Sequence, residues 1–127
     1  FSVNPKEVAV KFGSTATFEV TLHIAKPFHV NAHEPGDEYM IPLKLSLTGC
    51  EGLKLTAAYP KGEAYKGELA EGTIFIHSGV VTIPVRIEQT GKFTGTPRVS
   101  ITYQTCTDKE CLEPKTELLG VRIVADR

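Results

Sequence analysis

Apolar side chains recur at every second position in six stretches of the chain. A period of two places one face of a β-strand against a core and the other in solvent, so each stretch predicts a half-buried strand. No segment keeps a helical period over three turns. The alternating positions are Val8, Val10 and Phe12; Phe18, Val20, Leu22 and Ile24; Leu43, Leu45 and Leu47; Ile74 and Ile76; Val81, Ile83, Val85 and Ile87; and Val99, Ile101 and Tyr103.

Turn-forming sequences separate these stretches, among them "GST", "HEPGDE", "TGCEG", "YPKGEAYKGE" and "TGKFTGTP". Gly, Pro, Asn, Asp and Ser favour turns, each for its own conformational reason. About eight short strands with such punctuation are typical of a sandwich of two sheets. We therefore predict an all-β fold, an immunoglobulin-like antiparallel β-sandwich that forms a single domain over residues 1–127. A closed barrel is the main alternative.

The length and the charge of the chain exclude further classes of function. A chain of 127 residues can bury a core without covalent cross-links. Lys and Arg number 14 against 15 Asp and Glu, with no long run of either sign, so we expect no nucleic-acid binding and no attraction to an anionic membrane surface. There is also no apolar run long enough to cross a bilayer.

Three cysteines carry the candidate chemistry. Cys106 and Cys111 stand four residues apart at the end of a predicted strand, and Cys50 lies in "TGCEG", where we expect a turn thiol without function. In one continuous strand, Cys106 and Cys111 would lie about 16 Å apart on opposite faces and no bond could form. If residues 107–110 form a hairpin loop, the two Cα atoms face each other at about 4.5 to 5.5 Å, which allows a disulfide.

A disulfide closing so short a loop stabilises a fold by only about 2 kcal/mol in the chain-entropy account. A domain of this size does not depend on that contribution. Lys109 would favour a thiolate, whereas Asp108 and Glu110 would oppose it, so the direction of any cysteine pKa shift stays open. On spacing alone, a structural hairpin disulfide and a redox-active pair are equally well supported.

Two histidines offer a competing interpretation. His29 and His33, taken with the cysteine pair, suggest a four-ligand zinc site. Pro27 and Pro35 argue against the helix that would place both imidazoles on one side. We therefore expect no metal and no cofactor, with His29 and His33 exposed in a loop. His23 and His77 are expected at the surface or the rim of the sandwich.

Three segments resemble the N-terminal domain of the thiol:disulfide interchange protein DsbD. The most specific is "ITYQTCTDKECLEP", in which a strand ending Tyr-Gln is followed by two cysteines four or five residues apart and then by proline. "FHVNAHEPGDEYMIPLKLSL" is similar to the family's aromatic-x-Val/Ile-Asn segment, and "VVTIPV" to the strand that follows its shielding loop. The resemblance covers the chain from about Phe12 to its end.

The resemblance implies a periplasmic protein-disulfide reductase module. Its reduced cysteine pair would pass two electrons to oxidised thioredoxin-fold proteins, and a thioredoxin-like electron-donor domain linked to a membrane carrier would reduce it again. The module would meet the membrane only through domains missing from this chain. An immunoglobulin-like binding or scaffold domain with a structural disulfide is the alternative.

By position, the resemblance makes Cys106 and Cys111 the exchanging pair, with Cys111 forming the mixed disulfide with partners. The family's flexible shielding loop with an aromatic tip matches "GEAYKGE", which puts Tyr65 over the pair. Tyr103 and Asn31 match positions that flank the site, and Asp108 and Glu110 lie inside the cysteine loop. After the second cysteine, Leu112 and Glu113 replace the aromatic residue and proline that are common there, so partner contacts are expected to differ.

Overall fold

The computed structural model describes residues 2–36, 39–66 and 72–125, and these residues form eleven β-strands. None of them forms a helix long and apolar enough to span a bilayer. In chain order the strands are β1 (Ser2–Asn4), β2 (Glu7–Val10), β3 (Thr15–Ile24), β4 (His29–Asn31), β5 (Lys44–Ala57), β6 (Glu63–Tyr65), β7 (Ile74–His77), β8 (Gly79–Tyr103), β9 (Thr105–Cys106), β10 (Lys115–Leu118) and β11 (Arg122–Ala125).

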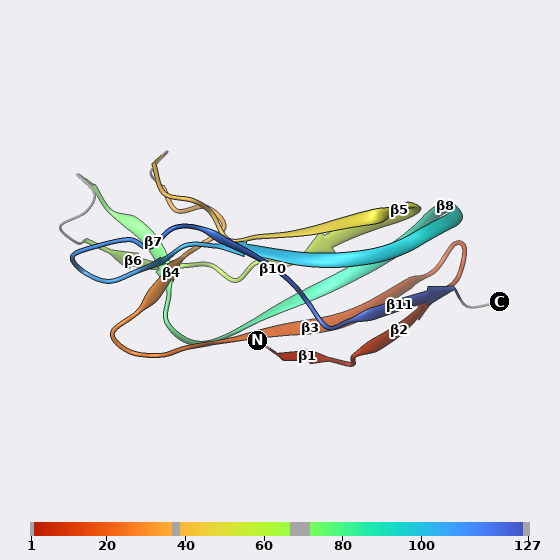
Figure 1. The fold of residues 1–127 in the computed structure, drawn as a ribbon, viewed down its shortest axis with the longest axis horizontal. Coiled ribbons are helices and arrows are strands. Elements are labelled where there is room, and N and C mark those ends of the chain that lie inside the picture. The colour runs from red at the N-terminus through yellow and green to blue at the C-terminus, as the bar shows by residue number, and fades with distance from the viewer. Residues whose placement is uncertain (1, 37–38, 67–71, 126–127) are drawn as a thin grey trace.

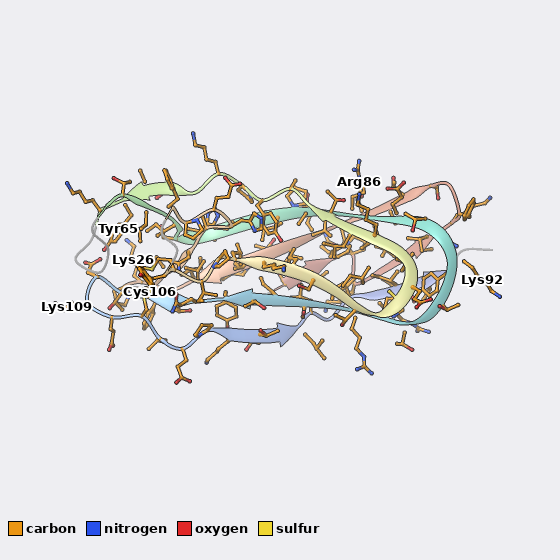
Figure 2. The ribbon with its side chains drawn as sticks, turned by 90° about the horizontal axis from the view of Figure 1, so that it is seen from above. Lys26, Tyr65, Arg86, Lys92, Cys106 and Lys109 are labelled. Carbon is orange, nitrogen blue, oxygen red and sulfur yellow. A yellow bond between two sulfur atoms is a disulfide. The ribbon has the colours of Figure 1, made fainter. Side chains whose placement is uncertain are left out.

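Strands β5 and β8 form a bent ribbon that supplies both layers of the sandwich. Residues 79–88 of β8 pair with β3 in one layer, while its residues 100–103 pair with β10 in the other. Strand β5 follows β8 through the bend and pairs with it on both sides. Figure 1 shows β3 with β1 in the lower layer and β5 with β10 in the upper one. In Figure 2 the ribbon turns at the end of the molecule marked by Lys92.

Glycines permit the bend. The pairing of β5 with β8 shifts register between Thr48 and Cys50 and again between Glu51 and Leu53. Gly95, at the inside of this turn, has a φ of 89°, and a Cβ there would lie 2.3 Å from the carbonyl oxygen of Gly49. No side chain fits in that space. Glycine therefore lets β5 and β8 pass from one layer to the other without ending.

The main core lies between the two layers. Phe18 of β3 faces Val85 of β8 in one layer, and Leu45 of β5 faces Ile101 of β8 in the other. All four are almost completely buried and belong to one apolar cluster. The period-two pattern therefore predicts most of this core correctly, because most of the alternating apolar residues turn inward.

A second, smaller sheet stands at the end of the molecule opposite the bend. Its strand order is β6-β7-β4-β9, with each pair antiparallel. Figure 1 shows β4, β6 and β7 gathered at this end. A short parallel pair, β2 with β11, is the one departure from antiparallel pairing among the described strands. The four-stranded sheet carries Cys106 in β9, and Cys111 faces Cys106 in an isolated bridge.

The all-β, immunoglobulin-like sandwich predicted from the sequence is confirmed, and the described strands form separate sheets rather than a closed barrel. Two predicted turns are wrong: "TGCEG" and "TGKFTGTP" lie inside β5 and β8, where the bulges and glycines bend the strands without ending them. Cys50 is accordingly a half-buried strand residue paired with Gly95. Phe12 lies beyond the end of β2 and is exposed, so it is not a core residue.

Candidate functional site

The cysteine pair forms a disulfide across a four-residue hairpin loop. Cys106 ends β9 and faces Cys111 in an isolated antiparallel bridge, with an Sγ–Sγ distance of 2.09 Å and a Cα–Cα distance of 4.0 Å. The prediction that residues 107–110 form a hairpin is confirmed. Cys50 is the remaining free thiol of the chain, and burial raises its pKa.

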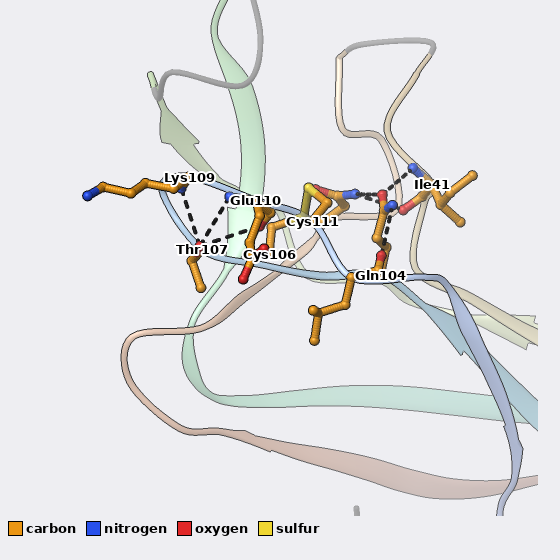
Figure 3. The surroundings of a disulfide bond; sticks show 9 residues. Ile41, Gln104, Cys106, Thr107, Lys109, Glu110 and Cys111 are labelled. Atoms are coloured by element: carbon orange, nitrogen blue, oxygen red, sulfur yellow. Dashed lines mark hydrogen bonds between the residues drawn. A yellow bond between two sulfur atoms is a disulfide. The ribbon is translucent and has the colours of Figure 1, made fainter.

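Thr107 organises the loop between the cysteines. Its backbone N–H donates to the carbonyl of Glu110 at 2.7 Å, and its Oγ1 accepts the N–H groups of Lys109 at 3.3 Å and Glu110 at 3.2 Å (Figure 3). A hydroxyl that accepts nearby backbone N–H groups stabilises a turn. No role was predicted for this threonine from the sequence. Glu110 takes part through its backbone, while its side chain is exposed.

Gln104, two residues before Cys106, joins three segments. Its Oε1 accepts the Asn31 Nδ2 hydrogen at 3.0 Å and the Ile41 backbone N–H at 3.1 Å, and its Nε2 donates to the carbonyl of Leu112 at 3.3 Å (Figure 3). One amide side chain thus connects β4, the segment before β5 and the residue that follows Cys111. Gln104 is the glutamine of the Tyr-Gln motif, and no role was predicted for it from the sequence.

Cys106 shares one face of the small sheet with two buried polar side chains. Residues directly opposite in an antiparallel ladder, and residues two apart along a strand, point to the same side. His29 is opposite Cys106, and Asn31, two residues later, is opposite Ile76. His29 is 5% exposed, Asn31 0% and Cys106 1%. Cys106 therefore lies on a covered face of the small sheet together with His29 and Asn31.

Two hydrogen bonds fix the side chain of Asn31 on that face. Its Nδ2 donates to the carbonyl of Ile41 at 3.0 Å as well as to Gln104, while its buried Oδ1 has no hydrogen-bond partner among the described residues. The sequence placed Asn31 beside the cysteines by resemblance alone. In the structure it lies on the same face as Cys106.

A small apolar cluster covers the rest of this face. Met40, Ile74 and Ile76 are buried together, and both Tyr65 and Cys111 pack against them. This cluster is separate from the main core. The disulfide consequently lies in an apolar niche of its own at the end of the sandwich.

Tyr65 bridges from β6 to the cysteine loop. Its hydroxyl donates a hydrogen bond to Oδ1 of Asp108, and its ring centroid lies 4.9 Å from that of His29 with the two planes tilted by 48°. Figure 2 shows Tyr65 at the same end of the molecule as Cys106. Of the "GEAYKGE" stretch, residues 67 and 68 lie outside the described residues.

The two cysteines differ in exposure. Cys106 is 1% exposed, whereas Cys111 is partly exposed, and Leu112 beside it is 44% exposed. Cys111 is therefore the more accessible residue of the pair.

The histidine predictions fail in two places. His29 was expected in an exposed loop but is a buried residue of β4, and His77, expected at the rim, is a buried residue of β7 opposite Val30. Burial lowers the pKa of both imidazoles, while the charge of Asp108 at His29 and that of Glu63 at His77 act in the opposite direction. The alternation rule could have identified His29, because it lies two residues from the predicted site residue Asn31.

The zinc alternative finds no ligand set in the described part of the chain. Cys106 and Cys111 are bonded to each other, and no group of three or more His, Cys, Asp or Glu is close enough there to hold a metal. His33 lies elsewhere: its Nδ1 is 2.8 Å from the carbonyl oxygen of Leu43, and its ring stacks on Tyr59 at 3.8 Å.

Tyr103 belongs to the sandwich side of the site. Its hydroxyl donates to Oε2 of Glu117 at 3.2 Å, across the pairing of β8 with β10, and its ring packs against the main core. Burial raises the pKa of Tyr103, and the charge and hydrogen bond of Glu117 raise it further. The described contacts of Tyr103 therefore support the strand that leads to Gln104 and Cys106.

A model of the family described as "Thiol:disulfide interchange protein DsbD, N-terminal" matches residues 4–122. The chain belongs to this family. Membership of the DsbD N-terminal family confirms the resemblance found in the cysteine segment and extends it to the first strands. No curated protein matches the chain significantly.

A solved structure supports the same fold. The N-terminal periplasmic domain of ScsB from Proteus mirabilis superimposes with a TM-score of 0.62 over 90% of this chain, at 14% sequence identity. The chain spans 44% of the length of that solved chain. At this identity the likeness concerns the fold alone, so the DsbD family membership rests on the family match.

Proposed function

We propose that this domain carries electron pairs by thiol–disulfide exchange, with Cys106 and Cys111 alternating between dithiol and disulfide. Oxidised thioredoxin-fold proteins receive the electrons, a thioredoxin-like donor domain restores the dithiol, and the setting is the periplasm. Membership of the DsbD N-terminal family supports this proposal. The donor and the recipients are taken from the family as a whole.

The unequal exposure of the two cysteines is the observation that carries the proposal. Exchange requires a thiolate and a disulfide sulfur to approach in line, so access decides which sulfur reacts with another protein. Cys111 is partly exposed and Cys106 is buried. We therefore assign partner contact to Cys111 and the internal step to Cys106.

The electrons balance in two steps. The Cys111 thiolate attacks one sulfur of the partner disulfide, forms a mixed disulfide and releases the partner's other cysteine as a thiolate. The Cys106 sulfur, after losing its proton, then attacks Sγ of Cys111 and expels the partner's second thiolate. The partner gains two electrons, and the domain is left with the Cys106–Cys111 disulfide.

The hairpin bonds argue against a purely structural disulfide. Thr107 donates to Glu110, and the backbone N–H of Leu112 donates to Thr105 at 2.8 Å, so backbone bonds close the loop on both sides of the sulfur bridge. The bridge itself adds only about 2 kcal/mol in the chain-entropy account. Its reduction therefore leaves the loop held in place, which a reversible carrier needs.

Exposed apolar side chains beside the site suit partner binding. Leu112 is 44% exposed next to Cys111, and Tyr39 is 84% exposed next to the buried Met40. Aromatic and other large apolar residues are enriched at the centre of protein interfaces. Leu112, the direct neighbour of Cys111, therefore lies where a protein reaching Cys111 would contact the domain.

The reduction potential separates a carrier from a scaffold. We expect the Cys106–Cys111 pair of the Cys50→Ser variant, which lacks the third thiol, to equilibrate with glutathione or dithiothreitol buffers between about −180 and −270 mV. A potential below about −300 mV is typical of structural disulfides and would favour the immunoglobulin-like scaffold instead.

A further inference from the structure

His29 is the titratable side chain that lies directly opposite Cys106. The two residues are partners in the pairing of β4 with β9, and both are buried on the covered face of the small sheet. Directly opposed side chains have Cβ atoms about 5 Å apart, within reach of an imidazole and a thiol. The function proposed above assigns no role to this histidine.

The surroundings of His29 suit a neutral base. Burial lowers its pKa, so the imidazole is uncharged at neutral pH and has a lone pair to accept a proton. Among the described residues, the other titratable groups beside it are Tyr65, whose ring contacts it from β6, and Asp108, whose charge acts on it from the cysteine loop. Asp108 is exposed, whereas the imidazole is buried in the position directly opposite Cys106.

The second step of exchange needs such a base. A thiol has an ordinary pKa of about 8.5, so only a small fraction of such thiols is ionised at pH 7 without a base. Cys106 is 1% exposed, and a partner joined to Cys111 would cover the site further. Bulk water is thus a poor route for the proton that has to leave.

We propose that His29 accepts the Cys106 proton as the mixed disulfide is resolved. The Cys106 S–H bond breaks, its electron pair forms the new bond to Cys111, and the proton passes to the imidazole. The partner cysteine leaves as a thiolate with the electron pair of the mixed disulfide, and the imidazolium later gives its proton to that thiolate or to solvent. This inference rests on the proposed exchange function.

An aromatic disulfide reagent, 5,5′-dithiobis(2-nitrobenzoate), separates the two steps. The reduced Cys50→Ser chain releases one thionitrobenzoate when Cys111 attacks and a second when Cys106 resolves the mixed disulfide, so stopped-flow absorbance records two phases. At neutral pH we expect His29→Gln and His29→Phe to slow the second phase by about 100-fold, the size of a general-base effect. The rate of the first phase should stay within about threefold of the parent rate, because His29 does not act as a base in the attack by Cys111.

The pH profile identifies a base as opposed to a packing residue. In the parent chain the rate of the second phase falls as pH drops through the lowered pKa of His29. In both variants this rate rises with pH until the Cys106 thiol ionises without a base. The difference in rate between parent and variants therefore disappears at alkaline pH. His29→Phe preserves a ring beside Tyr65, so restoration of the parent rate in that variant would overturn the proposal. His23→Gln, at an exposed position of β3, is the matched control and leaves both phases unchanged.

Folding and the wider function are checked separately. If the variants unfold, as seen by circular dichroism, the parent profile still decides: a second phase that rises tenfold per pH unit from acid to alkaline pH contradicts a histidine base. A Cys106→Ser chain that traps no mixed disulfide contradicts the exchange function itself, whatever His29 does. Two normal phases in folded His29 variants contradict only the role of His29.

Discussion

The two ends of the sandwich are built by different means. At the bend, glycines let β5 and β8 change layers, and a Cβ on Gly95 would lie 2.3 Å from a backbone oxygen. At the cysteine end, the side chains of Thr107 and Gln104 accept backbone N–H groups and hold the chain in place. The buried polar residues described in the structure, His29, Asn31 and His77, all belong to the small sheet at this second end.

The difference suggests that the bend contributes to stability and that the small sheet carries the residues proposed for exchange. Buried polar groups are costly unless they are bonded, and groups with shifted pKa values gather at functional sites. None of the described buried polar residues lies at the bend, where the closely packed backbone at Gly49 and Gly95 leaves no room for a side chain. Changes at the bend should therefore affect folding, and changes in the small sheet should affect exchange.

The largest stability effect is expected at the bend. Gly95→Ala should lower the free energy of unfolding by about 3 kcal/mol, since it combines a left-handed backbone with a backbone clash. Gly13→Ala is the matched control: φ is 81° but nothing lies within 4 Å of the added Cβ, so only about 1 kcal/mol is lost.

Urea unfolding measures both losses, and the exchange rate of the folded fraction should stay at the parent value. Equal losses in the two variants would show that close packing at the bend contributes nothing. A slowed exchange rate in folded Gly95→Ala would contradict the separation of the two ends.

Gln104→Ala comes next in size. Removing this amide leaves the Ile41 N–H and one Asn31 side-chain N–H without an acceptor. This should lower the free energy of unfolding by about 2 kcal/mol and also alter the exchange rate. Gln89→Ala at the bend removes one local bond to Gly91 and should cost about 0.5 kcal/mol with no change in exchange. If both variants exchange normally, Gln104 is only structural.

The sequence predicted the sandwich, its core and the hairpin disulfide because these follow from local rules. Period two places Phe18 and Ile83 in the core without knowledge of their neighbours. The long strands through "TGCEG" and "TGKFTGTP" were missed since glycines serve equally in turns and in bends within a strand. Whether such a segment turns or continues depends on pairing with a distant strand.

The site was only partly predictable for the same reason. The spacing of Cys106 and Cys111 fixes a local geometry, whereas Gln104 acts through Asn31 and Ile41, which are brought beside it by the fold. His29 faces Cys106 through a pairing of residues far apart in the chain. Its neighbour Asn31 was identified by family resemblance alone.

Acid should destabilise the fold through the two buried histidines of the small sheet. Burial lowers the pKa of His29 and His77, so the unfolded chain binds protons that the folded one does not, and the free energy of unfolding falls as pH drops below about 6.5. His77→Leu should flatten this decline, whereas His23→Leu at an exposed position should not. Urea unfolding between about pH 7 and pH 5 tests this sign. Greater stability at the lower pH would contradict it.

The smallest effect is expected from Tyr65. Tyr65→Ala should speed alkylation of the reduced cysteine pair severalfold by uncovering the niche that Tyr65 and Cys111 share, while Tyr65→Phe, which retains the ring, should change it less. Tyr59→Ala, whose ring stacks on His33, is the control with no expected change. An unchanged rate in Tyr65→Ala would remove the shielding role of Tyr65.

Trapping a mixed disulfide tests the central claim most directly. Reduced Cys106→Ser, which retains Cys111, should accumulate a covalent complex with an oxidised thioredoxin-fold protein, visible on a non-reducing gel and removed by dithiothreitol. Cys111→Ser should trap little, and Cys50→Ser should behave as the parent chain. A complex trapped only by Cys111→Ser would reverse the roles of the two cysteines, and no complex with either variant would contradict exchange at this pair.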